Sequence, residues 1–247
     1  METDKKSINV CCISDTHGLH SELVLPAADV LIHAGDFTNY GELERVTEFL
    51  SWYREQPAPI KLLTCGNHEV EISHMLPVLR DACEEAGVHL LINSGMTLPN
   101  GMKAWGSPCC PRYGRGWAFM REDDDLNEVW NQIPWGVDIL ITHGPPYEVL
   151  DLSETKVRCG SQTLRRMVEL VQPQLHVFGH IHEGTGSVLL PDGYGLAVNA
   201  SLVNRRCQNS GKRQPALVQV SLRESGKPPV VLQNPRITPP TEAKNAT

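Results

Sequence analysis

The chain has 247 residues, of which 40% are hydrophobic and 21% are charged, and its formal net charge is −7. This composition is ordinary for a soluble globular protein, and the length fits one large α/β domain. The acidic balance argues against broad binding to nucleic acid or to an anionic membrane, because both need a basic surface. It does not exclude phosphate chemistry, since metal ions can supply positive charge locally.

The cysteines and the N-terminal sequence indicate a reducing compartment. The eight cysteines include no Cys-x-x-Cys pair, so we expect small buried thiols that stay reduced. The first residues lack the apolar stretch of a signal peptide, and no run of about 18 apolar residues predicts a membrane span. We therefore expect a cytoplasmic protein, in which the glycosylation sequons at Asn199 and Asn245 are chance matches.

The first half of the chain alternates short apolar runs with amphipathic segments. Apolar runs rich in Val, Ile and Leu predict strands over residues 8–13, 28–34, 60–65 and 88–92. Apolar residues at helical spacing predict helices over residues 41–56 and 74–86. A Pro-Asn-Gly turn predicts a β-hairpin of residues 96–98 and 102–105.

The second half continues this alternation. Strands are predicted over residues 137–142, 175–178, 187–190, 194–199 and 216–222. Helices are predicted over residues 122–133 and 160–171, and the acidic run at 122–125 suits the N-terminus of the first of them. We expect a flexible N-terminus over residues 1–7, a single domain over 8–224 and a Pro-rich polar tail over 225–247.

Residues 107–119 form a segment rich in aromatic residues, Gly and Pro that also contains Arg112 and Arg115. Two interpretations stay open at this point. The segment is either a surface loop packed by its own side chains or a lip over an active site that contacts the substrate.

Five of the apolar runs end in Asp, Asn or His. Groups at the carboxyl ends of neighbouring strands converge on one edge of a sheet, where open α/β folds bind ligands. Seven side chains that follow these runs could together hold two divalent ions: Asp15, His17, Asp36, Asn67, His143, His180 and His182. His33 lies inside an apolar run, and we expect it to be a packed or supporting residue rather than a ligand.

The ordered set of motifs resembles the calcineurin-like metallophosphoesterase superfamily over roughly residues 8–204. The motifs are Asp15-x-His17, Gly35-Asp36, Gly66-Asn67-His68-Glu69, His143-Gly144 and Gly179-His180-x-His182. The runs 28–38 and 140–146 are similar to the brain-type, class III phosphodiesterase-like group of metallophosphoesterase-domain-containing proteins. Some members of that group have Gly in place of the first His of Gly-His-x-His. This chain keeps His180, which implies a complete second metal site, and Glu69, where much of the superfamily has Asp, is expected to support the ligands.

The resemblance implies an α/β fold in which two mixed β-sheets pack as a sandwich flanked by helices. It also implies two metal sites that share Asp36. One would use Asp15, His17, Asp36 and His182, and the other would use Asp36, Asn67, His143 and His180. Oxygen and imidazole ligands suit Mn²⁺, which we expect most, and also Fe, Zn²⁺ or Co²⁺.

The activity that the resemblance implies is hydrolysis of a phosphoester by in-line attack of a hydroxide that bridges the metals. His68 would protonate the leaving oxygen, and Asn67, His68 and Arg112 would contact the substrate. We expect a small phosphodiester, cyclic nucleotides included, and neither stable nucleic-acid binding nor a membrane partner. The alternatives are a phosphomonoesterase or protein phosphatase, a metal-binding interaction scaffold with little turnover, and a purely structural protein whose histidines pack in the core.

Overall fold

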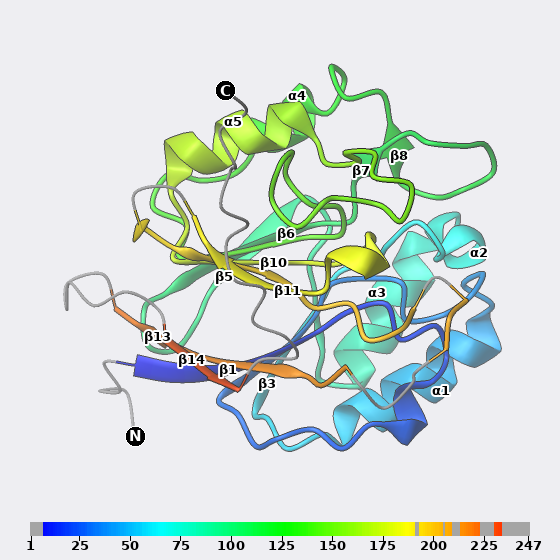
Figure 1. Cartoon of the computed structure of the whole chain (residues 1–247). Coiled ribbons are helices and arrows are strands. Elements are labelled where there is room, and N and C mark those ends of the chain that lie inside the picture. Colours follow the sequence, from blue (N-terminus) through cyan, green and yellow to red (C-terminus); the bar gives the residue numbers. More distant parts are fainter. Residues whose placement is uncertain (1–6, 191–192, 205, 209–212, 223–229, 234–247) are drawn as a thin grey trace, which may run out of the picture.

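The computed structural model describes residues 7–190, 193–204, 206–208, 213–222 and 230–233. Two six-stranded sheets lie face to face, and helices cover their outer faces (Figure 1). Both sheets are mixed, so the predicted α/β sandwich of two mixed sheets flanked by helices is confirmed.

The first sheet is parallel in its centre and antiparallel at one edge. Its strands are β1 (Ser7–Ile13), β2 (Val30–His33), β3 (Ile60–Leu63), β4 (His89–Leu90), β13 (Ala216–Ser221) and β14 (Val230–Gln233). Their order across the sheet is β14-β13-β1-β2-β3-β4, and β1 to β4 run parallel. The edge strand β14 lies within residues 225–247, the segment predicted as a tail, while residues 1–6, 223–229 and 234–247 of the predicted termini lie outside the described residues.

The second sheet has a parallel centre between two antiparallel edges. Its strands are β5 (Ser94–Thr97), β6 (Lys103–Ser107), β9 (Ile139–Thr142), β10 (Leu175–Phe178), β11 (Gly186–Leu189) and β12 (Leu196–Asn199). Their order is β11-β12-β10-β9-β6-β5, and the predicted hairpin is present as β5 and β6. A small third sheet pairs β7 (Cys110–Pro111) with β8 (Met120–Arg121).

The main core lies between the two large sheets. Val10 and Ile32 of the first sheet pack in one cluster with Ile141, Val177 and Val198 of the second. Burying such a side chain contributes about 1.5–3 kcal/mol relative to leaving it exposed. This interface fixes the two sheets against each other, and so it also fixes the strand ends that bear the candidate ligands.

The outer face of the first sheet is covered by α1 (Leu43–Arg54) and α3 (Leu76–Glu85), with the short α2 (Val70–Ser73) before α3. The buried face of α1 includes Val46, Phe49 and Tyr53 at helical spacing. The Tyr53 hydroxyl lies 3.2 Å from the Leu31 carbonyl and 2.8 Å from that of Leu62, so this helix is tied to the neighbouring strands β2 and β3.

The outer face of the second sheet is covered by α4 (Asn127–Trp130) and α5 (Gln162–Val171). The predicted helix over residues 122–133 is therefore wrong for most of its length. Asp123, expected at the start of that helix, instead accepts hydrogen bonds from the backbone amides of Gln162 and Thr163 at 3.0 and 3.3 Å. Its carboxylate caps the N-terminus of α5, where a negative charge is stabilising.

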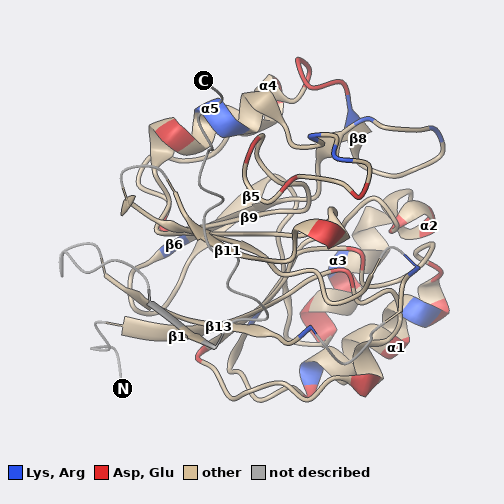
Figure 2. Cartoon of the chain, in the orientation of Figure 1, with Lys and Arg blue, Asp and Glu red and all other residues tan. Residues whose placement is uncertain are grey.

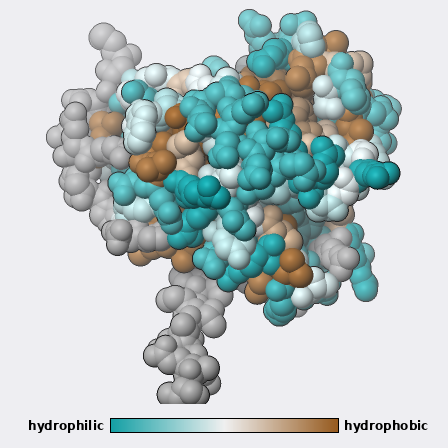
Figure 3. All heavy atoms as spheres, turned by 90° about the horizontal axis from the view of Figure 1, so that it is seen from above, coloured by the Kyte–Doolittle hydropathy of each residue, from teal (hydrophilic) through white to brown (hydrophobic). Residues whose placement is uncertain are grey.

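Charged residues lie mainly on the helices and loops, while the sheets are nearly free of them (Figure 2). The face seen in Figure 3 is mostly hydrophilic, with hydrophobic groups in separate small areas. Within the described part of the chain, no helix has the length and apolar character needed to cross a bilayer.

Candidate metal centre

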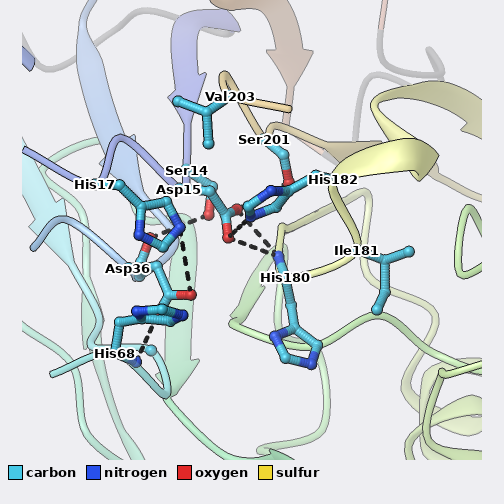
Figure 4. Close-up of polar contacts among 12 residues, drawn as sticks. Ser14, Asp15, His17, Asp36, His68, His180, Ile181, His182, Ser201 and Val203 are labelled. Atoms are coloured by element: carbon cyan, nitrogen blue, oxygen red, sulfur yellow. Dashed lines mark hydrogen bonds and ion pairs between the residues drawn. The ribbon is translucent and has the colours of Figure 1, made fainter. Parts of the chain in front are cut away.

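The candidate ligands meet where the central strands of both sheets end. Asp15 and His17 follow β1, Asp36 follows β2, and Asn67 follows β3. His143 follows β9, and His180 and His182 follow β10. The structure thus brings all seven predicted ligand side chains to one edge of the sandwich, and Figure 4 shows part of this cluster.

The turns that present these side chains have an uncommon backbone conformation. Asp15, His17, Asp36 and His180 have φ angles of 52°, 44°, 55° and 67°. This left-handed region costs an L-residue roughly 1–2 kcal/mol, and such strain clusters at functional sites. Hydrogen bonds between the turns hold them in place: the Asp15 amide donates to Gly35 at 2.9 Å, and the His17 amide donates to Asp36 at 3.1 Å.

Three groups of side chains have ligand atoms within 4.8 Å of one another. They are Asp15 with His17 and His182, His17 with Asp36 and His68, and Asp36 with His143 and His180. Asp36 is shared between groups, and its Oδ2 lies 3.3 Å from His143 Nε2 and 3.9 Å from His17 Nε2. Asn67 lies next to the group of Asp36, His143 and His180, because its Oδ1 is 2.9 Å from His143 Nε2. The geometry therefore places one carboxylate between two sets of nitrogen and oxygen donors.

The state of the imidazoles fits a metal centre. Both ring nitrogens of His17 are buried and have no hydrogen-bond partner among the described residues, which is costly unless they bind something. Burial lowers the pKa of His17 to about 4 and that of His180 to about 3, so both rings are neutral, the form that binds metals. With carboxylate and amide oxygens beside them, these residues suit divalent ions such as Mn²⁺, Fe, Co²⁺ or Zn²⁺.

The two carboxylates among the predicted ligands, Asp15 and Asp36, are ionised. Burial by itself would raise the pKa of Asp15, but its hydrogen bond to His182 and the nearby histidines hold that pKa well below its usual range. In the same way, His143 outweighs burial and lowers the pKa of Asp36. Burial would lower the pKa of His143, yet the Asp36 charge raises it to about 9. The cluster thus holds two carboxylate charges that divalent ions would neutralise, and metal binding would displace the proton from His143.

Glu69 supports the turns from beneath, as expected for a residue next to a ligand. Its buried carboxylate accepts hydrogen bonds from the backbone amides of Asp36, Thr38 and Gly66 at 2.9, 3.0 and 2.6 Å. Burial and the Asp36 charge raise its pKa to about 7, against the pull of these donors. Glu69 therefore connects the turns that follow β2 and β3.

His33 connects the turns that follow β1 and β2. Its Nδ1 accepts from the Gly35 amide at 3.2 Å, so the ring proton is on Nε2, which donates to Thr16 Oγ1 at 3.0 Å. The predicted supporting role of His33 agrees with these contacts.

The segment after β12 also supports the site, and sequence reasoning missed it. Ser201 Oγ donates to Asp15 Oδ2 at 2.8 Å, and His182 Nδ1 donates to the Asn204 carbonyl at 3.0 Å. Asn199 is buried and its Oδ1 accepts a hydrogen bond from the Ser201 backbone amide at 3.2 Å, so its sequon is inaccessible in the folded chain. The available signal was the apolar run before Asn199, which resembles the runs before the predicted ligands.

The segment 107–119 lies over the candidate site, which favours the interpretation as a lip. The Tyr113 hydroxyl accepts a hydrogen bond from Asn67 Nδ2 at 3.1 Å, and the Trp117 ring centroid is 4.3 Å from that of His68. Arg112, predicted to contact substrate, pairs with Glu122 at 2.8 Å.

A cavity of about 630 Å³ opens above the ligand cluster. Asp36, Asn67 and His68 lie in its lining, together with residues 111–113, 153–155 and 157–160. This volume is within the range of sites that hold small organic molecules.

Sequence comparisons identify relatives over most of the chain. The calcineurin-like phosphoesterase family profile matches residues 8–184. The human metallophosphoesterase domain-containing protein 1 is 39% identical over 214 residues, which cover 77% of this chain and 65% of that protein. A UPF0046 protein of Caenorhabditis elegans is 36% identical over 211 residues, covering 80% of this chain and 71% of that protein. The chain thus spans about 65% of the length of the human relative.

Two solved structures have a similar fold. TT1561 of Thermus thermophilus matches with a TM-score of 0.60 and 14% identity, over 93% of this chain and 99% of that one. The phosphopantetheinyl hydrolase PptH of Mycobacterium tuberculosis matches with a TM-score of 0.55 and 16% identity, over 81% of this chain and 90% of that one. At these identities the likeness concerns the fold alone. From the profile match and the human relative, the chain belongs to the calcineurin-like phosphoesterase family.

Proposed function

We propose that this chain is a metal-dependent phosphodiesterase that hydrolyses small phosphodiesters, with cyclic nucleotides among the candidate substrates. The observation on which the proposal mainly rests is the position of Asp36 between two donor clusters in the lining of the 630 Å³ cavity. That arrangement suits two neighbouring cations beneath a phosphate group. Bound divalent ions would neutralise the phosphoryl oxygens and lower the pKa of a bound water.

The residues of the chain then have separate tasks. Asp15, His17, His182 and the shared Asp36 would hold one ion, and Asp36, Asn67, His143 and His180 would hold the other. His68 would give a proton to the leaving oxygen, because its Nδ1 is hydrogen bonded to the Asn39 carbonyl at 2.9 Å and its Nε2 is left for the substrate. Arg112, which also lines the cavity, would contact the substrate beyond the scissile bond.

Charge, ligand chemistry and free thiols support the proposed substrate size, metal and location. The net charge of −7 suits a small ligand better than long nucleic acid or a membrane surface. Mn²⁺ is the metal we propose, because the donor set has no thiolate. The eight cysteines are free thiols, which agrees with the cytoplasm as the proposed location.

The test is hydrolysis of bis(p-nitrophenyl) phosphate by metal-stripped protein with and without added Mn²⁺, and p-nitrophenyl phosphate is the matched monoester. We expect hydrolysis of the diester that depends on metal and exceeds that of the monoester. Preference for the monoester would make the chain a phosphomonoesterase. No hydrolysis of either compound by folded, metal-loaded protein would contradict the proposal and favour an interaction scaffold.

A further inference from the structure

The imidazole of His68 is held in one orientation by a hydrogen bond. Its Nδ1 lies 2.9 Å from the carbonyl oxygen of Asn39. A carbonyl only accepts, so Nδ1 donates, and Nε2 is the nitrogen available to a molecule in the cavity that His68 lines. The task proposed for His68 depends on this orientation.

Two aromatic rings bracket the imidazole. The His17 ring meets it edge-on, with centroids 4.5 Å apart and an angle of 87°. On the side of the lip, the Trp117 ring lies at 4.3 Å and 38°. These two contacts restrict rotation of the His68 ring away from the Asn39 carbonyl.

Trp117 is itself held by the segments that position His68. Its ring stacks on Tyr40, which follows Asn39, with centroids 6.1 Å apart at 17°. The next residue, Ala118, donates its amide to the carbonyl of Asn67 at 3.0 Å, and Asn67 precedes His68. The lip therefore closes on the unit formed by Asn39, Tyr40, Asn67 and His68.

We propose that Trp117 is a positioning residue that holds the His68 imidazole with Nε2 directed at the leaving-group oxygen. The inference rests on the proposed function and adds a residue outside the metal-binding motifs to it. A misplacement of about 1 Å at a reacting group can cost on the order of 10²-fold in rate. Loss of Trp117 should therefore weaken proton delivery while leaving the metal ligands in place.

The test compares two diesters that differ only in the leaving group, methyl p-nitrophenyl phosphate and methyl phenyl phosphate. Departure of phenoxide needs a proton far more than departure of p-nitrophenoxide. We expect Trp117→Ala to lower kcat/KM about tenfold more for the phenyl diester than for the nitrophenyl diester. Trp117→Phe should restore most of the loss, because a ring of similar shape returns to the same place.

Two further variants distinguish a loss of His68 positioning from a non-specific loss of activity. In a double-mutant cycle, Trp117→Ala added to His68→Ala should cost nothing more on the phenyl diester. Trp135 is a matched control, since it is 71% exposed and precedes β9, whereas His143 follows that strand at the site. Trp135→Ala should behave as the wild type. Equal losses on both diesters, or full additivity with His68→Ala, would overturn the proposal.

A second measurement does not depend on catalysis. Acylation of His68 by diethyl pyrocarbonate, followed by peptide mass spectrometry on metal-free full-length protein, reports how well the ring is enclosed. We expect a faster reaction at His68 in Trp117→Ala than in the wild type or in Trp135→Ala. An unchanged rate would overturn the proposal. If the wild type cleaves neither diester, the proposed function fails, and the labelling alone decides whether Trp117 encloses His68.

Discussion

At the scale of single residues, Asp36 links two of the groups of candidate ligands. Its carboxylate lies 3.3 Å from His143 and 3.9 Å from His17, so it faces both proposed metal sites. The left-handed backbone of Asp36, with a φ of 55°, directs the side chain there. A change of this one residue would therefore affect both proposed ions.

Mutation of a residue that only hydrogen bonds to a metal ligand typically costs about 10–100-fold in metal affinity or activity. Because Asp36 is proposed as a ligand itself, we expect Asp36→Asn to lower metal-dependent kcat/KM by at least about 10²-fold. The amide keeps the shape but loses the charge that the two proposed ions would share, so both should bind more weakly. Metal content after gel filtration and kcat/KM measure the two effects. A variant with normal metal content and normal rate would remove Asp36 from the bridging position.

His68→Ala separates a proton donor from a ligand. His68 lies within 4.8 Å of His17 and Asp36, so the geometry also allows it to touch an ion. We expect the variant to keep its metal and to lose about 10²–10⁴-fold in rate on a diester with a poor leaving group. Loss of one ion per chain would instead make His68 a ligand.

Sequence reasoning identified the candidate ligands because each stands directly after an apolar run. It could not identify their hydrogen-bond partners, which are set by how distant segments meet. Ser201 is 186 positions from Asp15, and Asn39 is 29 positions from His68. Nothing in their local sequence marks such contacts.

At the scale of elements, the strands were predictable and the acidic segment was not. The strands are buried on both faces, so their apolar runs are continuous and easily recognised. The run at 122–125 has the charge of a helix N-terminus, but the helix that it serves is α5, about 40 positions later. The local charge indicates that the segment lies next to the N-terminus of a helix in space. Only the tertiary fold shows that this helix is α5.

The turns after β2 and β3 act as one unit through Glu69. Glu69→Gln replaces one carboxylate oxygen by an amide that faces backbone N–H groups, so we expect a loss of about 1–3 kcal/mol in the free energy of unfolding. Denaturant unfolding measures this loss. Glu71→Gln, at an exposed position of α2, is the matched control. Equal stability of Glu69→Gln and the wild type would contradict the supporting role.

At the scale of the whole molecule, the site exists because two sheets are packed against each other. The turns after β1, β2 and β3 meet those after β9 and β10 across the buried core of Val10, Ile32 and Val177. Periodicity alone predicts only alternating strands and helices; the sandwich followed from the resemblance to a family. The pairing order of the strands, and the addition of β14 within the predicted tail, depend on contacts between distant segments.

We propose that this one edge of the molecule binds two ions through the seven convergent side chains. The most direct test is to strip the full-length protein of metal, reload it with Mn²⁺ and count the ions retained per chain by mass spectrometry after gel filtration. We expect two ions per chain in the wild type and fewer in Asp36→Asn. Retention of no Mn²⁺, or of a single ion, by folded wild-type protein would contradict the proposal.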